Sequence, residues 1–121
     1  MSKSAFTLKA FSLYVLAAGV LFALVPATTL ALAGLSPAPD VWPRIVGLMA
    51  LVIGVYYQAA AHAEAGAVIV ASILTRGGFA LAIAALVGLT LAPPPMLLFG
   101  LIDLVGALWT YAALRSEARL A

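Results

Sequence analysis

The feature that most constrains the fold is an apolar stretch near the C-terminus that contains one acidic residue. Residues 96–114, MLLFGLIDLVGALWTYAAL, are long enough to cross a bilayer as a helix, and Asp103 lies inside them. A carboxylate is costly in hydrocarbon and rarely faces lipid. At helical spacing its face also carries Met96, Gly100, Ala107 and Thr110. Because these residues are mostly small or polar, the pattern predicts a helix contact there rather than a lipid-facing surface.

The composition assigns the whole chain to the membrane. Of its 121 residues, 66% are apolar and 8% are charged, whereas soluble domains have about 25% charged residues. The sequence has no cysteine and a single histidine, which excludes disulfides, thiolate chemistry and a polyhistidine metal site. The net charge of +2 comes mainly from basic residues near the two ends, a distribution typical of membrane orientation rather than nucleic-acid binding. We expect one membrane domain, residues 1–121, with the lipid bilayer as partner, no cofactor, no metal and no nucleic acid.

Four apolar stretches separated by helix breakers predict an all-α fold, an antiparallel bundle of four transmembrane helices. The expected helices cover residues 9–31, with a break near Pro26, and residues 43–62, 67–91 and 96–114. Proline lacks the amide hydrogen, so the first helix should kink or end at Pro26, and a short second piece should reach Gly34. A basic start, an apolar run and a small-residue end are also typical of a secretory signal. We interpret this stretch instead as an uncleaved first helix.

The connections predict which helices are neighbours and which side the termini occupy. Residues 34–43, GLSPAPDVWP, form the clearest loop, with Asp40 expected to cap the next helix. The later connections are short, which favours antiparallel packing of the second helix on the third and of the third on the fourth. Both ends of the chain carry basic residues: Lys3, Lys9, Arg115 and Arg119. By the positive-inside rule both termini are expected in the cytoplasm.

Five residues form the candidate polar core or ligand site: Arg44, Tyr57, Gln58, Arg76 and Asp103. Their expected depths favour an ion pair of Asp103 with Arg44, and place Asp103 with Arg76 second. Such a pair fits a structural role, since it can fix helix register without chemistry. Arg44 could instead pair with Asp40 four residues earlier, and Arg76 could reach cytoplasmic headgroups.

The remaining polar and aromatic residues of this region fit simpler roles. Tyr56 and Tyr57 are typical of the aromatic belt at the membrane surface, and His62 and Glu64 are expected to be solvated. No catalytic residue, nucleotide loop or metal-ligand cluster is recognisable.

Small residues at helical spacing predict close helix packing. The positions expected to pack are Gly47, Gly54, Gly77, Ala80, Ala84, Gly88, Gly100, Gly106 and Ala107. The glycine pair at 77–78 costs roughly 1 kcal/mol per residue against alanine in a soluble helix, which suggests that close approach is its use.

Several short motifs resemble a known group of bacterial membrane proteins. They are WPRIVG at 42–47, GVYYQAA at 54–60, TRG at 75–77, LAPP at 91–94 and FGLIDLVGALWT at 99–110. Over roughly residues 6–114 the chain is similar to small four-helix proteins of the BphX-like and DoxX-like kind. The resemblance implies a four-helix bundle in the inner membrane of a bacterium, and it marks Arg44, Tyr57, Arg76 and Asp103 as the positions of the family's polar residues. It implies no activity, and a fold does not supply one.

Three functions are compatible with this sequence. The first is a non-enzymatic membrane protein that packs against itself or against a larger membrane protein. The second is a binder or carrier of a lipophilic small molecule, quinone-like or aromatic, held between helices by the candidate polar residues. The third is a dimeric ion-coupled transporter that uses Asp103. Small exporters of this size usually carry their carboxylate in the first helix, which here has none, and this disfavours the third function. An enzyme is equally disfavoured.

Overall fold

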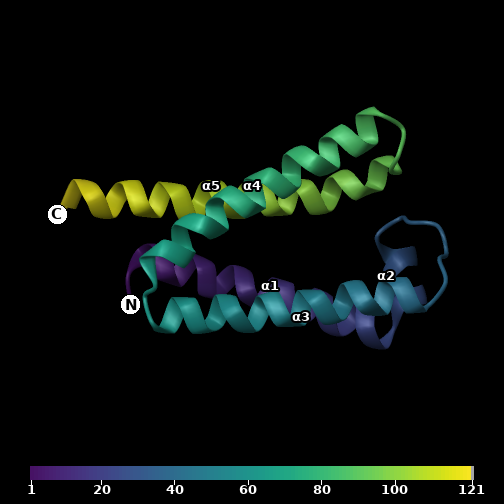
Figure 1. Ribbon diagram of the computed structural model, residues 1–121, viewed down its shortest axis with the longest axis horizontal. Coiled ribbons are helices and arrows are strands. Elements are labelled where there is room, and N and C mark those ends of the chain that lie inside the picture. Colours follow the sequence, from purple (N-terminus) through teal and green to yellow (C-terminus); the bar gives the residue numbers. More distant parts are fainter. Residues whose placement is uncertain (121) are drawn as a thin grey trace.

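Four long helices make up most of the computed structural model, which describes residues 1–120 (Figure 1). They are α1 (Lys3–Leu24), α3 (Val41–His62), α4 (Gly66–Gly88) and α5 (Leu97–Leu120), joined by a short α2 (Pro26–Leu32) and a 3-10 turn, η1 (Pro94–Met96). Each long helix is long and apolar enough to cross a membrane, the last one over Pro94–Ala118. The protein is therefore a multi-pass membrane protein with an all-α, four-helix fold, as the sequence predicts.

The helices pack in the order α3, α1, α5, α4. Figure 1 shows α1 beside α3 and α4 beside α5, and α1 also contacts α5 along the line between the two pairs. The predicted packing of the third long helix on the fourth is confirmed. The predicted packing of the second on the third is wrong, because α4 diverges from α3 after their turn (Figure 1) and the two helices make few contacts. The glycine face of α3 lies against α1 instead.

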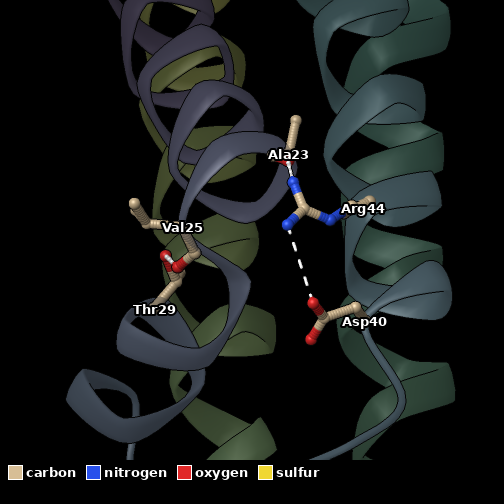
Figure 2. Close-up of polar contacts among 5 residues, drawn as sticks. All are labelled: Ala23, Val25, Thr29, Asp40 and Arg44. Atoms are coloured by element: carbon tan, nitrogen blue, oxygen red, sulfur yellow. Dashed lines mark hydrogen bonds and ion pairs between the residues drawn. The ribbon is translucent and has the colours of Figure 1, made fainter.

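The break at Pro26 divides the first apolar stretch in two, as predicted. α1 ends at Leu24, and Pro26 occupies the first position of α2. The Thr29 hydroxyl donates to the carbonyl oxygens of Leu21 (2.9 Å) and Val25 (2.8 Å), as Figure 2 shows for Val25. Both carbonyls also accept backbone N–H groups, those of Val25 (2.9 Å) and Thr29 (3.0 Å), so the hydroxyl ties the last turn of α1 to the first turn of α2 across the break.

Three helices end with one residue in the left-handed conformation. These residues are Gly34 (φ 74°), Glu64 (φ 48°) and Thr90 (φ 60°), which follow α2, α3 and α4. After each of them a backbone N–H donates five residues back, for example Leu91 to Leu86 at 2.8 Å. This hydrogen bond satisfies a carbonyl of the last helical turn. As a result α4 ends at Gly88, before the three prolines that were predicted to stop it at Leu91.

The first helix begins earlier than predicted. Residues before Lys9 read as a polar extension in the sequence, but α1 starts at Lys3 because Ser2 caps it, accepting from the Ala5 N–H at 3.1 Å. Thr7 and Leu8 are consequently buried. The two ends of the chain lie at the same end of the molecule, together with the α3–α4 turn (Figure 1).

Candidate functional site

A continuous chain of buried polar side chains joins α1, α4 and α5. Its members are almost fully enclosed: Ser4, Thr7, Ser72, Arg76 and Thr110. Arg76, with 2% of its surface exposed, is the largest of them. It lies about 15 Å along α4 from Gly66 at 1.5 Å per residue, near the middle of the span. A charge at that depth is expensive, and residues like it are the usual candidates for function.

Arg76 is held by both hydrogen bonds and aromatic rings. Its Nε donates to the Ser72 carbonyl oxygen (3.1 Å), and its Nη2 donates to the hydroxyls of Ser72 (3.1 Å) and Thr110 (2.9 Å). The guanidinium carbon lies 4.7 Å from the centroid of the Phe11 ring and 5.9 Å from that of Tyr57. Cation–π contacts of this kind strengthen when the cation is desolvated. The side chain therefore stays inside the protein, and the alternative prediction that it reaches the headgroups is wrong.

Thr110 connects Arg76 to the first helix. Its hydroxyl lies 2.8 Å from that of Thr7 and 3.1 Å from the Gly106 carbonyl oxygen. The Thr7 hydroxyl in turn donates to the Ser4 carbonyl oxygen at 2.7 Å. Since Thr110 is completely buried, water cannot replace these partners. The helix pair α4–α5 is thus tied to α1 by hydrogen bonds as well as by packing.

Two carboxylates complete the chain at the end that holds the termini. Glu117 of α5 accepts from both the backbone N–H (2.7 Å) and the hydroxyl (3.0 Å) of Ser4. Glu64, in the α3–α4 turn, accepts from the backbone N–H of Ser2. This bond lowers the pKa of Glu64 below its usual value of 4.5. Both carboxylates stand at the N-terminus of α1, where the helix dipole favours negative charge.

Asp103 lies near this chain of side chains without joining it. The residue is half-buried on the face of α5 that also carries the buried Gly100, Gly106 and Ala107. The charges of Asp103 and Arg76 attract each other, but no ion pair or hydrogen bond to Asp103 occurs in residues 1–118. Within the same part of the chain, Nη1 of Arg76 is a buried nitrogen with no hydrogen-bond partner. The site therefore holds one unmet donor and one unmet acceptor.

The predicted ion pair of Asp103 with Arg44 does not form. Arg44 pairs with Asp40 instead, with 3.6 Å between Nη2 and Oδ2, and its Nη1 donates to the Ala23 carbonyl oxygen at 2.6 Å (Figure 2). The cation thereby caps the C-terminal end of α1, where positive charge is favourable. Asp40 stands at the start of α3, but its side chain makes no capping hydrogen bond there, in contrast to the prediction.

Gln58 and Tyr57 take different places in the α1–α3 contact. The Gln58 amide donates to the Ser12 hydroxyl at 2.5 Å, so Gln58 serves the contact between these two helices. The Tyr57 ring lies 6.4 Å from the Phe11 ring and adjoins Arg76. Of the five predicted site residues, the structure brings Tyr57, Arg76 and Asp103 together and leaves Arg44 and Gln58 elsewhere. His62 is exposed, as expected.

The predicted packing positions divide into two groups. Gly47 and Gly54 face α1, where a Cβ would lie 2.6 Å from Gly19 O and 2.6 Å from Leu16 Cδ2, respectively. On α5, an added Cβ at Gly100 would meet Ile83 and Ala80, and one at Gly106 would meet Phe11 and Arg76, while Ala107 is buried. On α4, however, a Cβ at Gly77 or Gly88 would meet nothing within 4 Å, and Ala84 is exposed. These three residues make no close contact with the other described residues, because α3 does not cover that side of α4.

The contribution of the first helix was not predicted from the sequence. Ser4, Thr7 and Phe11 recur at intervals of three and four residues, which is the spacing of one helical face, and Ser12 follows Phe11 directly. That spacing, together with Ser2 as a possible helix cap, could have indicated that the first helix begins near Lys3 and has a polar face. Glu117 was also missed, because nothing local indicates that a residue in the C-terminal tail contacts the start of the chain. Tyr14, which neighbours both Phe11 (5.5 Å between ring centroids) and Asp103, carried no signal of its own.

The fold and the site define a small integral membrane protein of four spans, whose two helix pairs are joined by a buried polar network. The described residues contain no group of three or more histidine, cysteine, aspartate or glutamate side chains that could hold a metal ion. No family model, no curated protein and no solved structure matches the chain. The resemblance to BphX-like and DoxX-like proteins stays a prediction.

Proposed function

We propose that this protein acts without catalysis, by packing laterally in the membrane against a second copy of itself or a larger membrane protein. The observation that carries the proposal is the open flank of α4. Along its length α4 contacts mainly α5, and Gly77, Ala84 and Gly88 share one side that no other helix of the described residues covers. Small residues let two helix backbones approach closely, which is how membrane helices associate without a hydrophobic driving force.

The state of the polar core supports this proposal. Most of its side chains have a hydrogen-bond partner inside the protein. Thr110 binds both Thr7 and Arg76, and Glu117 accepts from the backbone of Ser4. Groups engaged in this way fix the relative position of the helices. A chain whose polar residues hold its own shape, and whose outer surface offers a small-residue flank, is suited to serve as a packing partner.

A matched pair of substitutions on α4 tests the proposal. Ala84→Leu places a large side chain on the open flank, whereas Ala82→Leu makes the same change at an exposed position on the other side of the helix. Overpacking costs about 1–3 kcal/mol, so Ala84→Leu should weaken self-association at least about fivefold. Single-molecule photobleaching in liposomes measures the dimer fraction.

Three outcomes of that experiment decide the matter. Loss of dimers with Ala84→Leu alone supports association of the chain with itself. A wild-type chain that stays monomeric, but captures a membrane protein through the same flank, points to the larger partner. Equal behaviour of both variants in both assays contradicts the proposal.

A second candidate function follows from the unmet groups of Arg76 and Asp103. A lipophilic molecule with an acceptor oxygen and a donor hydrogen would satisfy Nη1 and the carboxylate together, beside the aromatic rings of Phe11 and Tyr57. Mass spectrometry of extracts from the purified protein tests this function. A compound retained by the wild type and absent from a stably folded Asp103→Asn variant would favour it, and identical extracts would oppose it.

For the orientation, we propose a bacterial inner-membrane protein with both termini in the cytoplasm. The support is the excess of lysine and arginine at the ends: Lys3, Lys9, Arg115 and Arg119. A reporter that is active only in the periplasm should stay silent when fused after Ala121. Activity of that fusion would reverse the orientation.

A further inference from the structure

A groove opens between α1 and α5 at the end of the molecule that holds the termini. It has a volume of about 560 Å³ and is separate from the buried polar chain, although Thr7 borders both. The residues that line it are Met1, Ser2, Lys3, Phe6, Thr7, Trp109, Ala112 and Ala113. None of the functions considered so far uses this groove.

The lining of the groove is amphiphilic. Phe6 and Trp109 meet edge to face with 6.3 Å between their ring centroids, and both remain about half exposed. At the polar end stands the side chain of Lys3, which forms no ion pair in the described part of the chain. An apolar wall that ends in positive charge fits a molecule with an acyl chain and an anionic head.

Nearby acidic groups do not cancel this positive charge by direct pairing. Glu117 is occupied by the backbone and hydroxyl of Ser4, and Glu64 binds the N–H of Ser2. Lys3 is therefore the principal cation available to a ligand in the groove.

The depth of the groove matches a lipid headgroup. Lys3 is the first residue of α1, at the membrane surface, while Phe6 and Trp109 lie further into their spans. Tryptophan is enriched at this level of a bilayer, and lysine side chains reach toward the headgroups. A lipid whose phosphate sat at Lys3 would lay its acyl chain along the two rings.

We propose that this groove binds one anionic phospholipid, with its phosphate at Lys3 and an acyl chain along Phe6 and Trp109. Charge complementarity selects the headgroup, since one lysine near an anionic membrane surface contributes about 1 kcal/mol. That energy corresponds to about a fivefold preference for an anionic over a zwitterionic lipid.

Fluorescence quenching tests the proposal directly, because Trp109 lines the groove. Trp42→Phe removes the other tryptophan, which lies exposed near the start of α3 at the opposite end of the molecule. The full chain is placed in phosphatidylcholine nanodiscs that contain a small fraction of lipid brominated on the acyl chain. Brominated phosphatidylglycerol should quench Trp109 with about fivefold higher apparent affinity than brominated phosphatidylcholine.

Three variants separate the groove from general attraction to the membrane. Lys3→Gln should abolish the preference for phosphatidylglycerol. Arg115→Gln removes an exposed cation at the same end of the molecule, outside the groove, and should retain it. Ala112→Leu narrows the groove and should weaken quenching by both lipids.

Any of three results would overturn the proposal. They are equal quenching of the wild type by both lipids, an equal loss of preference in the lysine and arginine variants, and unchanged quenching when Ala112 is enlarged. The first would show that the groove does not select charge. The second would show that the whole surface attracts the lipid, and the third that Trp109 senses bulk lipid.

Discussion

Replacing Gly47 with alanine is expected to push α1 and α3 apart. A Cβ at this position would lie 2.5 Å from the Ala23 nitrogen and 2.6 Å from the Gly19 carbonyl oxygen. Both are backbone atoms, so a side-chain rotation cannot relieve the clash, and one helix must move by close to 1 Å. Overpacking costs about 1–3 kcal/mol, and movement of a whole helix places Gly47→Ala at about 3 kcal/mol.

Gly78→Ala is the matched control for this prediction. An added Cβ at Gly78 meets nothing within 4 Å, and Gly78 lies outside the small-residue flank of α4, so only helix propensity acts. Alanine is better than glycine in a helix interior by up to about 1 kcal/mol, which predicts an unchanged or slightly more stable protein. Unfolding in mixed micelles of increasing dodecyl sulfate fraction, followed by tryptophan fluorescence, measures both variants. Equal stability of the Gly47→Ala variant and the wild type would refute the reasoning, as would an equal loss in both variants.

Three further predictions concern the polar chain and the helix ends. Thr110→Val should cost about 1–3 kcal/mol, because it removes a hydrogen-bond acceptor from the buried Arg76. Thr7→Val should lower the free energy of unfolding less in the Thr110→Val variant than in the wild type, because the two hydroxyls bind each other. Additive losses in micelle unfolding would contradict this link between Thr7 and Thr110. Glu64 has a lowered pKa, so its contribution to stability is present above 4.5 and is lost as the pH falls through the folded value. The difference in melting temperature between Glu64→Gln and the wild type should therefore shrink on acidification, and a constant difference would oppose it. Thr90→Gly should raise stability by about 1 kcal/mol, since Thr90 has a φ of 60°, and an unchanged melting temperature would argue against strain there.

The features that the sequence predicts well depend on local chemistry. The lengths of the apolar stretches and the breakers between them determine four spans. Pro26 stops a helix through its own missing hydrogen. The small and polar face around Asp103 is likewise visible in one helix alone, and the structure places it in a helix contact. These predictions need no knowledge of how the helices are arranged.

The pairing of distant residues could not be predicted in the same way. Depth along each helix suggested Arg44 as the partner of Asp103, but depth does not say which helices are neighbours. Once α1 lies between α3 and α5, Arg44 is held at the end of α1. Arg76 then finds Thr110 and Phe11, residues of two helices that were not expected to meet it.

The order of synthesis gives the link between α1 and α5 a further meaning. Thr7 and Thr110 are 103 residues apart in the chain, and Glu117 lies 113 residues after Ser4. While the ribosome is still producing α3 and α4, the polar face of α1 has no partner and borders lipid or the insertion machinery. The first hairpin therefore stays incomplete until the last helix arrives. A chain truncated before α5 is therefore expected to be removed by quality control rather than accumulate.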